Sequence, residues 1–193
     1  ENEVPEQDER NNVGSSLYGC RIEQTPITTN TIYEAWRWNG LASNPLVNSL
    51  NQTPSVTQLT DDNGDGAINA YDIPDLVFVA GLRNSITPAI TALVAISGDD
   101  GHELWSRTDI ALSPYSSVAT GDIDNDGVAE IIAVRNYREE LIAFENTGAI
   151  KWRAPLDGPG SIVPLIPPPG FVFDQPIIVN LEGDNEAEIV LGR

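Results

Sequence analysis

Short apolar runs separated by polar turns make up most of the chain from about residue 31 onward. No stretch shows the sustained period of about 3.6 residues that an amphipathic helix requires. The runs are rich in Val, Ile and Leu, as in ITALVAIS and EIIAV, and turn sequences such as Asn146-Thr147-Gly148 separate them. This pattern predicts an all-β fold. The expected strands are 75–80, 90–97, 103–107, 117–121, 130–134, 140–145, 149–153, 162–166, 176–180 and 188–191.

The runs also recur in a fixed order: an acidic loop, two apolar strands, and a turn followed by a strand that carries Trp. The first copy ends near Trp105, the second near Trp152, and a third opens at Asn180. About four strands in each copy are typical of β-propeller blades. We therefore expect two full blades and one partial blade, in units of about 55–110, 115–156 and 175–193. Because a closed propeller needs at least about four blades, the array is expected to be open or completed by neighbouring chains.

The N-terminal part differs from this repeat region, which we place at 51–193. Residues 1–50 begin with a polar, acid-rich stretch and are expected to form an extended arm with a lead-in strand region. Trp36 and Trp38 alternate with other residues in this part, and we expect that one can face the core and the other a partner or a sugar.

The acidic loop of the second unit has the pattern of a calcium site. Calcium takes six to eight oxygen ligands, and carboxylates at alternate positions of a tight loop with a turn-forming Gly supply them compactly. An acidic hairpin loop without an ion is the alternative, but four carboxylates within nine residues repel one another unless they are neutralised. The expected ligands are Asp122, Asp124, Asp126, the Val128 carbonyl and Glu130.

The first acidic loop follows a stricter, EF-hand-like spacing, with Asp at the last position as in dockerin loops. Pro74 and the apolar run after it predict a strand, so we expect the loop chemistry without the flanking helices. Asp75 aligns with Glu130 and can replace or supplement the last ligand. The expected ligands are Asp61, Asn63, Asp65, the Ala67 carbonyl and Asp72.

The third acidic loop departs from the pattern, because Asn185 stands where Gly is preferred. A weak calcium site and a purely structural loop both remain open there. The residues concerned are Asn180, Glu182, Asp184 and Glu188.

Charge and cysteine content narrow the function further. The 193 residues include 29 acidic and 10 basic side chains, a net charge of −19, which disfavours nucleic acid and attracts divalent cations. No apolar run is long enough to span a membrane as a helix. Cys20 is the only cysteine, which leaves burial or a bond to another chain. The composition suits an extracellular or cell-surface protein.

Two segments, GDIDNDGVAEIIAV and LTDDNGDGAINAYDIPDLVFVAG, resemble the calcium loops of FG-GAP and VCBS-type repeats, a family that includes integrin-α propeller blades. GHELW and GAIKW resemble the Trp-bearing strand of quinoprotein-like blades. The resemblance covers about 55–193. It implies a β-propeller-like fold, structural calcium, and an extracellular role in adhesion or recognition.

Our functional prediction is a non-enzymatic, extracellular, calcium-binding structural or adhesive module that associates with itself or with another extracellular protein or glycan. A narrower form is a self-assembling surface fibre subunit, in which residues 1–30 add to an open sheet edge of the next subunit. The alternative is the propeller part of a carbohydrate-active enzyme such as a polysaccharide lyase, with Tyr115, Tyr137 and Arg138 as candidates. His102 lies in a turn without a nucleophile motif, so we expect a surface residue.

Overall fold

The structure, a computed structural model, describes residues 34–82, 90–135, 140–156, 175–184 and 186–191. These residues form eleven β-strands and no helix, so none of them belongs to a helix that could cross a membrane. The described part of the chain is therefore all-β, as the apolar runs predict. The strands are β1 (Val47–Leu50), β2 (Ser55–Thr57), β3 (Asp75–Leu82), β4 (Thr91–Ile96), β5 (Glu103–Arg107), β6 (Ala119–Gly121), β7 (Glu130–Val134), β8 (Glu140–Phe144), β9 (Ile150–Pro155), β10 (Pro176–Val179) and β11 (Glu188–Leu191).

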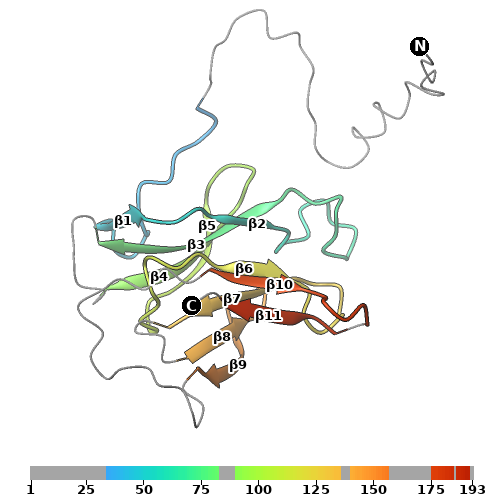
Figure 1. The fold of residues 1–193 in the computed structure, drawn as a ribbon. Helices are drawn as coiled ribbons and strands as arrows, with labels where there is room; N and C mark the ends of the chain where they lie inside the picture. The colour runs from blue at the N-terminus through green and yellow to red at the C-terminus, as the bar shows by residue number, and fades with distance from the viewer. Residues whose placement is uncertain (1–33, 83–89, 136–139, 157–174, 185, 192–193) are drawn as a thin grey trace, which may run out of the picture.

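The strands form two antiparallel sheets and one hairpin (Figure 1). In the first sheet the order is β1-β3-β4-β5, and β2 pairs with the same edge of β3 as β1 does. The second sheet has the order β6-β7-β8-β9, and β10 pairs with β11. Strands β2 to β5 and β6 to β9 are thus two copies of one four-stranded meander. The β10–β11 hairpin corresponds to the first half of a third copy.

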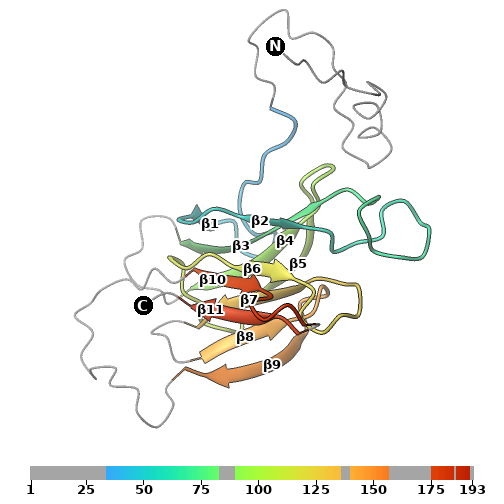
Figure 2. The same ribbon diagram turned by 45° about the vertical axis from the view of Figure 1, so that its right-hand side comes forward.

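The two sheets stack, and apolar side chains fill the space between them. The largest core cluster includes Val77 and Leu93 from the first sheet and Ile131 and Phe144 from the second. Two further clusters cover the outer face of the first sheet and the face of the second sheet toward the hairpin, where β10 contacts β6 and β7 (Figure 2). Strands β4 and β7 are buried along their whole length because both of their faces are covered. This double coverage explains why they read as continuous apolar runs.

Residues around the two N-terminal tryptophans cover the outer face of the first sheet. Trp36 and Trp38 both pack against the same apolar cluster, and Trp38 meets Phe78 edge to face with ring centroids 5.0 Å apart. The prediction that one of the two faces away from the core is therefore wrong. In extended backbone, side chains two residues apart lie on the same side, so Trp36 and Trp38 face the first sheet together while Arg37 between them is exposed.

The same tryptophan–glycine contact joins successive layers twice. The indole of Trp36 lies over Gly101, and the indole of Trp105 lies over Gly148; a Cβ on these glycines would approach ring carbons to 2.5 and 2.8 Å. Trp36 Nε1 donates to the Gly98 carbonyl at 3.1 Å, and Trp105 Nε1 donates to the Asn146 carbonyl at 2.8 Å. Both glycines also have positive φ, 76° and 79°. The turn of each unit is thus shaped to receive the indole of the layer before it.

The observed strands differ from the expected ones mainly near the N-terminus. No strand range was predicted for β1 or β2, whose segments VNSL and SVT are short and partly polar, although β1 lies in the lead-in strand region expected within 1–50. The expected strand at 162–166 and the arm at 1–30 lie outside the described residues. The described sheets form an open stack of layers; that these layers are propeller blades, open or completed by neighbouring chains, stays a prediction.

Candidate metal centre

Each unit has an acidic connection between its first two strands, and a carboxylate begins the second of these strands. Strand register places the three carboxylates at equivalent positions, level with the last residue of the preceding strand. Each accepts a hydrogen bond from the backbone N–H two residues beyond that strand, which fastens the connection to the sheet. The pairs are Asp75 with Leu59 (3.0 Å), Glu130 with Ile123 (2.8 Å) and Glu188 with Leu181 (2.7 Å).

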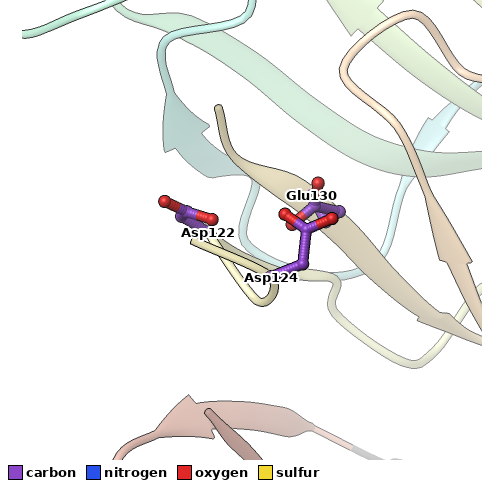
Figure 3. Close-up of side chains that lie close together, drawn as sticks. All are labelled: Asp122, Asp124 and Glu130. Carbon is purple, nitrogen blue, oxygen red and sulfur yellow. The ribbon is translucent and has the colours of Figure 1, made fainter. Parts of the chain in front are cut away.

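The β6–β7 connection gathers three carboxylates. Asp122, Asp124 and Glu130 each offer one oxygen, and these oxygens lie within 4.8 Å of one another. Figure 3 shows the carboxylates of Asp124 and Glu130 close together, with Asp122 to one side on the same loop. The Glu130 side chain is only 1% exposed, whereas Asp124 is 42% exposed. The cluster therefore extends from the surface of the loop into the edge of the core.

Backbone hydrogen bonds fix the shape of this loop. The Asp122 carboxylate accepts from the N–H of Asp126 at 3.2 Å and of Gly127 at 2.9 Å, and Asp126 accepts from the N–H of Val128 at 2.8 Å. Asn125 and Gly127 have positive φ, 61° and 91°, which Asn and Gly adopt more readily than other residues. The alternating acids thus serve first as caps for a tight turn.

A lysine from the last strand of the same unit also reaches the cluster. Lys151 Nζ lies 2.6 Å from Asp124 Oδ2 and 3.1 Å from Glu130 Oε1, and both Glu145 oxygens lie 3.2 Å away. The Lys151 side chain is 19% exposed. Sequence reasoning did not identify this residue; the only signal was Lys before Trp in GAIKW, where the first unit has GHELW.

The pKa shifts follow from these contacts. Burial raises the pKa of Glu130, and the hydrogen bonds from Ile123 and Lys151 oppose that rise in part. The hydrogen bond from Lys151 lowers the pKa of Asp124. Hydrogen bonds to Asp124, Glu130 and Glu145 raise the pKa of Lys151, so its ammonium stays charged.

Oxygen donors alone make up this cluster, which suits a hard divalent cation such as Ca²⁺ or Mg²⁺. Of the five ligands expected in the second loop, the structure brings Asp122, Asp124 and Glu130 together. The Asp126 carboxylate instead bonds to the loop backbone. The role of the Val128 carbonyl stays a prediction.

The first connection is longer, residues 58–74 against 122–129, and its carboxylates bind backbone N–H groups. Asp61 accepts from the N–H of Gly64, Asp65 and Gly66, at 2.7 to 3.1 Å. Asp72, 1% exposed, accepts from the N–H of Asp62, Asn63 and Asn69 at 2.7 to 3.3 Å. The Asn63 side chain accepts from the N–H of Asp65, and the Asp65 carboxylate accepts from the N–H of Ala67. Within the described residues, the second loop alone holds three carboxylates close enough to share an ion.

Asp75 occupies the place of Glu130 in the first unit, but its surroundings differ. Its Oδ2 accepts from Leu59 N–H and from the Thr60 hydroxyl, both at 3.0 Å, while buried Oδ1 has no hydrogen-bond partner among the described residues. Burial raises the pKa of Asp75. The matching positions on β5 and β9 are Leu104 and Lys151, so the first unit has no ammonium there.

The third connection is exposed and held by its own polar groups. Asn180 accepts from Gly183 N–H at 2.6 Å and donates to the Asp184 carbonyl, and Asp184 accepts from Glu186 N–H at 2.9 Å. Glu182 is also exposed. A cleft of about 290 Å³, lined by Asp122 and Asn125 together with Asn180, Asp184 and Glu186, lies between the second and third loops.

Comparison with known proteins gives a structural relative. No protein-family model matches the chain, and no curated protein matches it. The crystal structure of the V. cholerae biofilm matrix protein Bap1 is similar, with a TM-score of 0.67 and 26% sequence identity over 81% of this chain. The matched part is 25% of the Bap1 chain, so this chain spans about a quarter of that protein's length.

Proposed function

We propose that this chain is a non-enzymatic, calcium-binding structural module of an extracellular matrix or cell-surface assembly. The observation that carries the proposal is the Asp122–Asp124–Glu130 cluster, set at the edge of a stack of sheets similar to part of a biofilm matrix protein. An ion there joins the exposed side of the β6–β7 connection to the first residue of a core strand. The ion would hold the β6–β7 connection against the second sheet, since a metal that binds only the folded state stabilises that state.

Calcium is the cation that this geometry favours. Calcium tolerates irregular sites of six to eight oxygens, whereas magnesium requires a near-octahedral arrangement and retains several waters. In the second loop, Asp126 and the Val128 carbonyl complete the ligand set after the loop adjusts around the ion. In the first loop, the proposed ligands are Asp61, Asn63, Asp65, the Ala67 carbonyl and Asp72, with Asp75 next to them.

The proposed extracellular location and matrix role rest on the structural similarity to Bap1 and on the negative net charge of this chain. Bap1 is described as a biofilm matrix protein, and the net charge of −19 suits a protein that binds divalent cations. Self-association through open sheet edges is the form of assembly that we favour, because β5, β9 and β11 each end a sheet in the described part of the chain. The role of residues 1–30 in such assembly stays a prediction.

The enzymatic alternative has less support. Tyr137 and Arg138 lie outside the described residues, and Tyr115 lies in the connection between β5 and β6, away from the strand ends that carry the acids. His102 is exposed and bonds to Asp100 in the β4–β5 turn, as expected of a surface residue. Cleavage of an acidic polysaccharide by the purified chain would favour the alternative over our proposal.

Calcium binding by isothermal titration calorimetry tests the proposed function. The wild type is expected to bind calcium at the first and second loops. Asp122→Asn, which keeps an acceptor for the loop N–H groups, is expected to bind one ion fewer. Asp99→Asn removes the same charge from an exposed turn outside the acidic loops and is expected to bind as the wild type does. Absence of binding in the wild type, or equal stoichiometry in both variants, would contradict the proposal.

A further inference from the structure

The candidate calcium site already contains a cation of the protein itself. The Lys151 ammonium contacts two of the three clustered carboxylates, at 2.6 Å from Asp124 and 3.1 Å from Glu130. Among the ion pairs of the described residues, none joins Lys151 to Asp122, the third carboxylate of the cluster. The ammonium therefore occupies the inner part of the cluster, between the loop and the core strand.

A divalent ion bound by the same two carboxylates would lie directly against this ammonium. Like charges placed side by side with little water between them repel strongly. Glu130 is almost fully buried, so its charge is poorly solvated and needs a cation, either from the lysine or from a metal. The Lys151 ammonium and a bound metal ion would thus each neutralise the charge of Glu130, and both would occupy the same space beside it.

A displaced ammonium has another partner within reach. Both oxygens of Glu145 lie 3.2 Å from Lys151 Nζ, and the Glu145 side chain is 35% exposed. The four-carbon stem of Lys lets the ammonium move toward Glu145 without a change in strand β9. An ammonium that leaves Asp124 and Glu130 therefore keeps Glu145 as its ion-pair partner.

The first unit supports the view that this lysine is a specific addition. Leu104 occupies the position of Lys151, and the equivalent carboxylate, Asp75, keeps one buried oxygen without a hydrogen-bond partner among the described residues. The repeat fold thus forms without the ammonium, so the fold of a unit does not depend on it.

We propose that Lys151 and a divalent cation exclude each other at Asp124 and Glu130, so that Lys151 sets the calcium affinity of the second loop. This inference rests on the proposed function, because it concerns the same site. Lys151 also makes the site selective by charge. A monovalent cation brings no more charge than the ammonium that it would displace, whereas a divalent cation brings twice as much.

The test compares calcium affinity in Lys151→Met and Arg153→Met. Arg153 lies two residues further along β9 and pairs with Glu140, so its removal changes the net charge equally without touching the cluster. Chelator-buffered calcium titrations are followed through the NMR amide signals of Ile123 and Gly127, which report on the second loop alone because they bond to Glu130 and Asp122.

Lys151→Met is expected to bind calcium about 10- to 100-fold more tightly than the wild type, the range typical of changes next to metal ligands. Arg153→Met and the charge-keeping Lys151→Arg are expected to stay close to the wild type. Lys151→Gln, which keeps a hydrogen-bond donor and loses the charge, is a second neutral variant if Lys151→Met fails to fold. Na⁺ is expected to leave the Ile123 signal in place.

The outcomes separate this inference from the proposed function. Unchanged or weaker affinity in the neutral Lys151 variants would overturn the inference and leave calcium binding intact. If only the neutral Lys151 variants bind calcium, that result would support mutual exclusion of Lys151 and calcium, and it would contradict the proposal that the natural chain binds calcium. Absence of binding in every variant would overturn both.

Discussion

At the residue scale, Asp75 shows how the carboxylate that recurs in the three connections both stabilises the fold and carries an energetic cost. It is fully buried, it accepts hydrogen bonds from Leu59 N–H and Thr60, and one of its oxygens has no hydrogen-bond partner among the described residues. A carboxylate in this place fastens the connection, but its burial disfavours the charged form.

Replacement of Asp75 by Ala is expected to destabilise the fold by about 1–3 kcal/mol, because Leu59 N–H becomes a buried donor without a partner. Asp75→Asn is expected to cost less, since its carboxamide oxygen still accepts from that N–H. Urea denaturation in EGTA measures both. Equal losses for Ala and Asn would show that the hydrogen bond to Leu59 is not what makes the position important.

Asp109 provides a pH-dependent test at the same scale. Arg107 donates to both of its oxygens at 2.7 Å, and this pairing lowers the pKa of Asp109 to about 2. Because the folded pKa lies below the unfolded value of about 3.9, the stabilisation is complete above that value and is lost as the pH falls toward 2. Asp109 is 63% exposed, so the contribution is at most about 1 kcal/mol.

An NMR titration of the Asp109 carboxyl carbon is expected to give this lowered pKa in the wild type. In Arg107→Gln the pKa is expected to return to the ordinary range of Asp. A wild-type pKa in the ordinary range would mean that the ion pair does not persist in solution.

Between elements, the tryptophan–glycine contacts determine how the layers stack. Gly148→Ala places a methyl group 2.8 Å from a Trp105 ring carbon, in addition to the strain of φ 79°. Gly183 has nearly the same φ, 76°, but nothing lies within 4 Å of its missing Cβ, so Gly183→Ala isolates the backbone strain.

Gly148→Ala is therefore expected to cost about 1–3 kcal/mol more than Gly183→Ala, the usual penalty of overpacking. Guanidinium denaturation measures the stability of both variants, and the NMR signal of the Trp105 indole N–H, which donates to the Asn146 carbonyl, reports a displaced indole. Similar losses in the two variants would show that the indole does not rest on the turn.

The sequence predicted those elements whose signal is local. Strands such as β4 and β7 are buried on both faces and therefore appear as apolar runs, and the alternating acids of 122–130 are local to one loop. Strand β2 escaped prediction because it is short and half exposed. Lys151 escaped because it lies 21 residues from Glu130 along the chain, and only the meander brings β9 back to the loop.

At the scale of the whole molecule, equivalent units stack through apolar faces, and each places its acidic connection next to the first strand pair. The strands that would be innermost in a propeller, β2, β6 and β10, are neighbours in order, as a repeated array requires (Figure 1). Calcium held in the connections would stabilise the array at the strand ends, where the apolar core does not reach. The central claim is therefore that calcium is part of the folded structure.

A calorimetric melt of the natural chain in calcium and in EGTA tests this claim most directly. Calcium at about 100 times its dissociation constant is expected to stabilise the fold by about 2.7 kcal/mol for each site. For a chain of this size that corresponds to a rise in Tm of roughly 5–10 °C, reversed by EGTA. Identical melts in the two conditions would contradict the account and leave the acidic loops as metal-free turns.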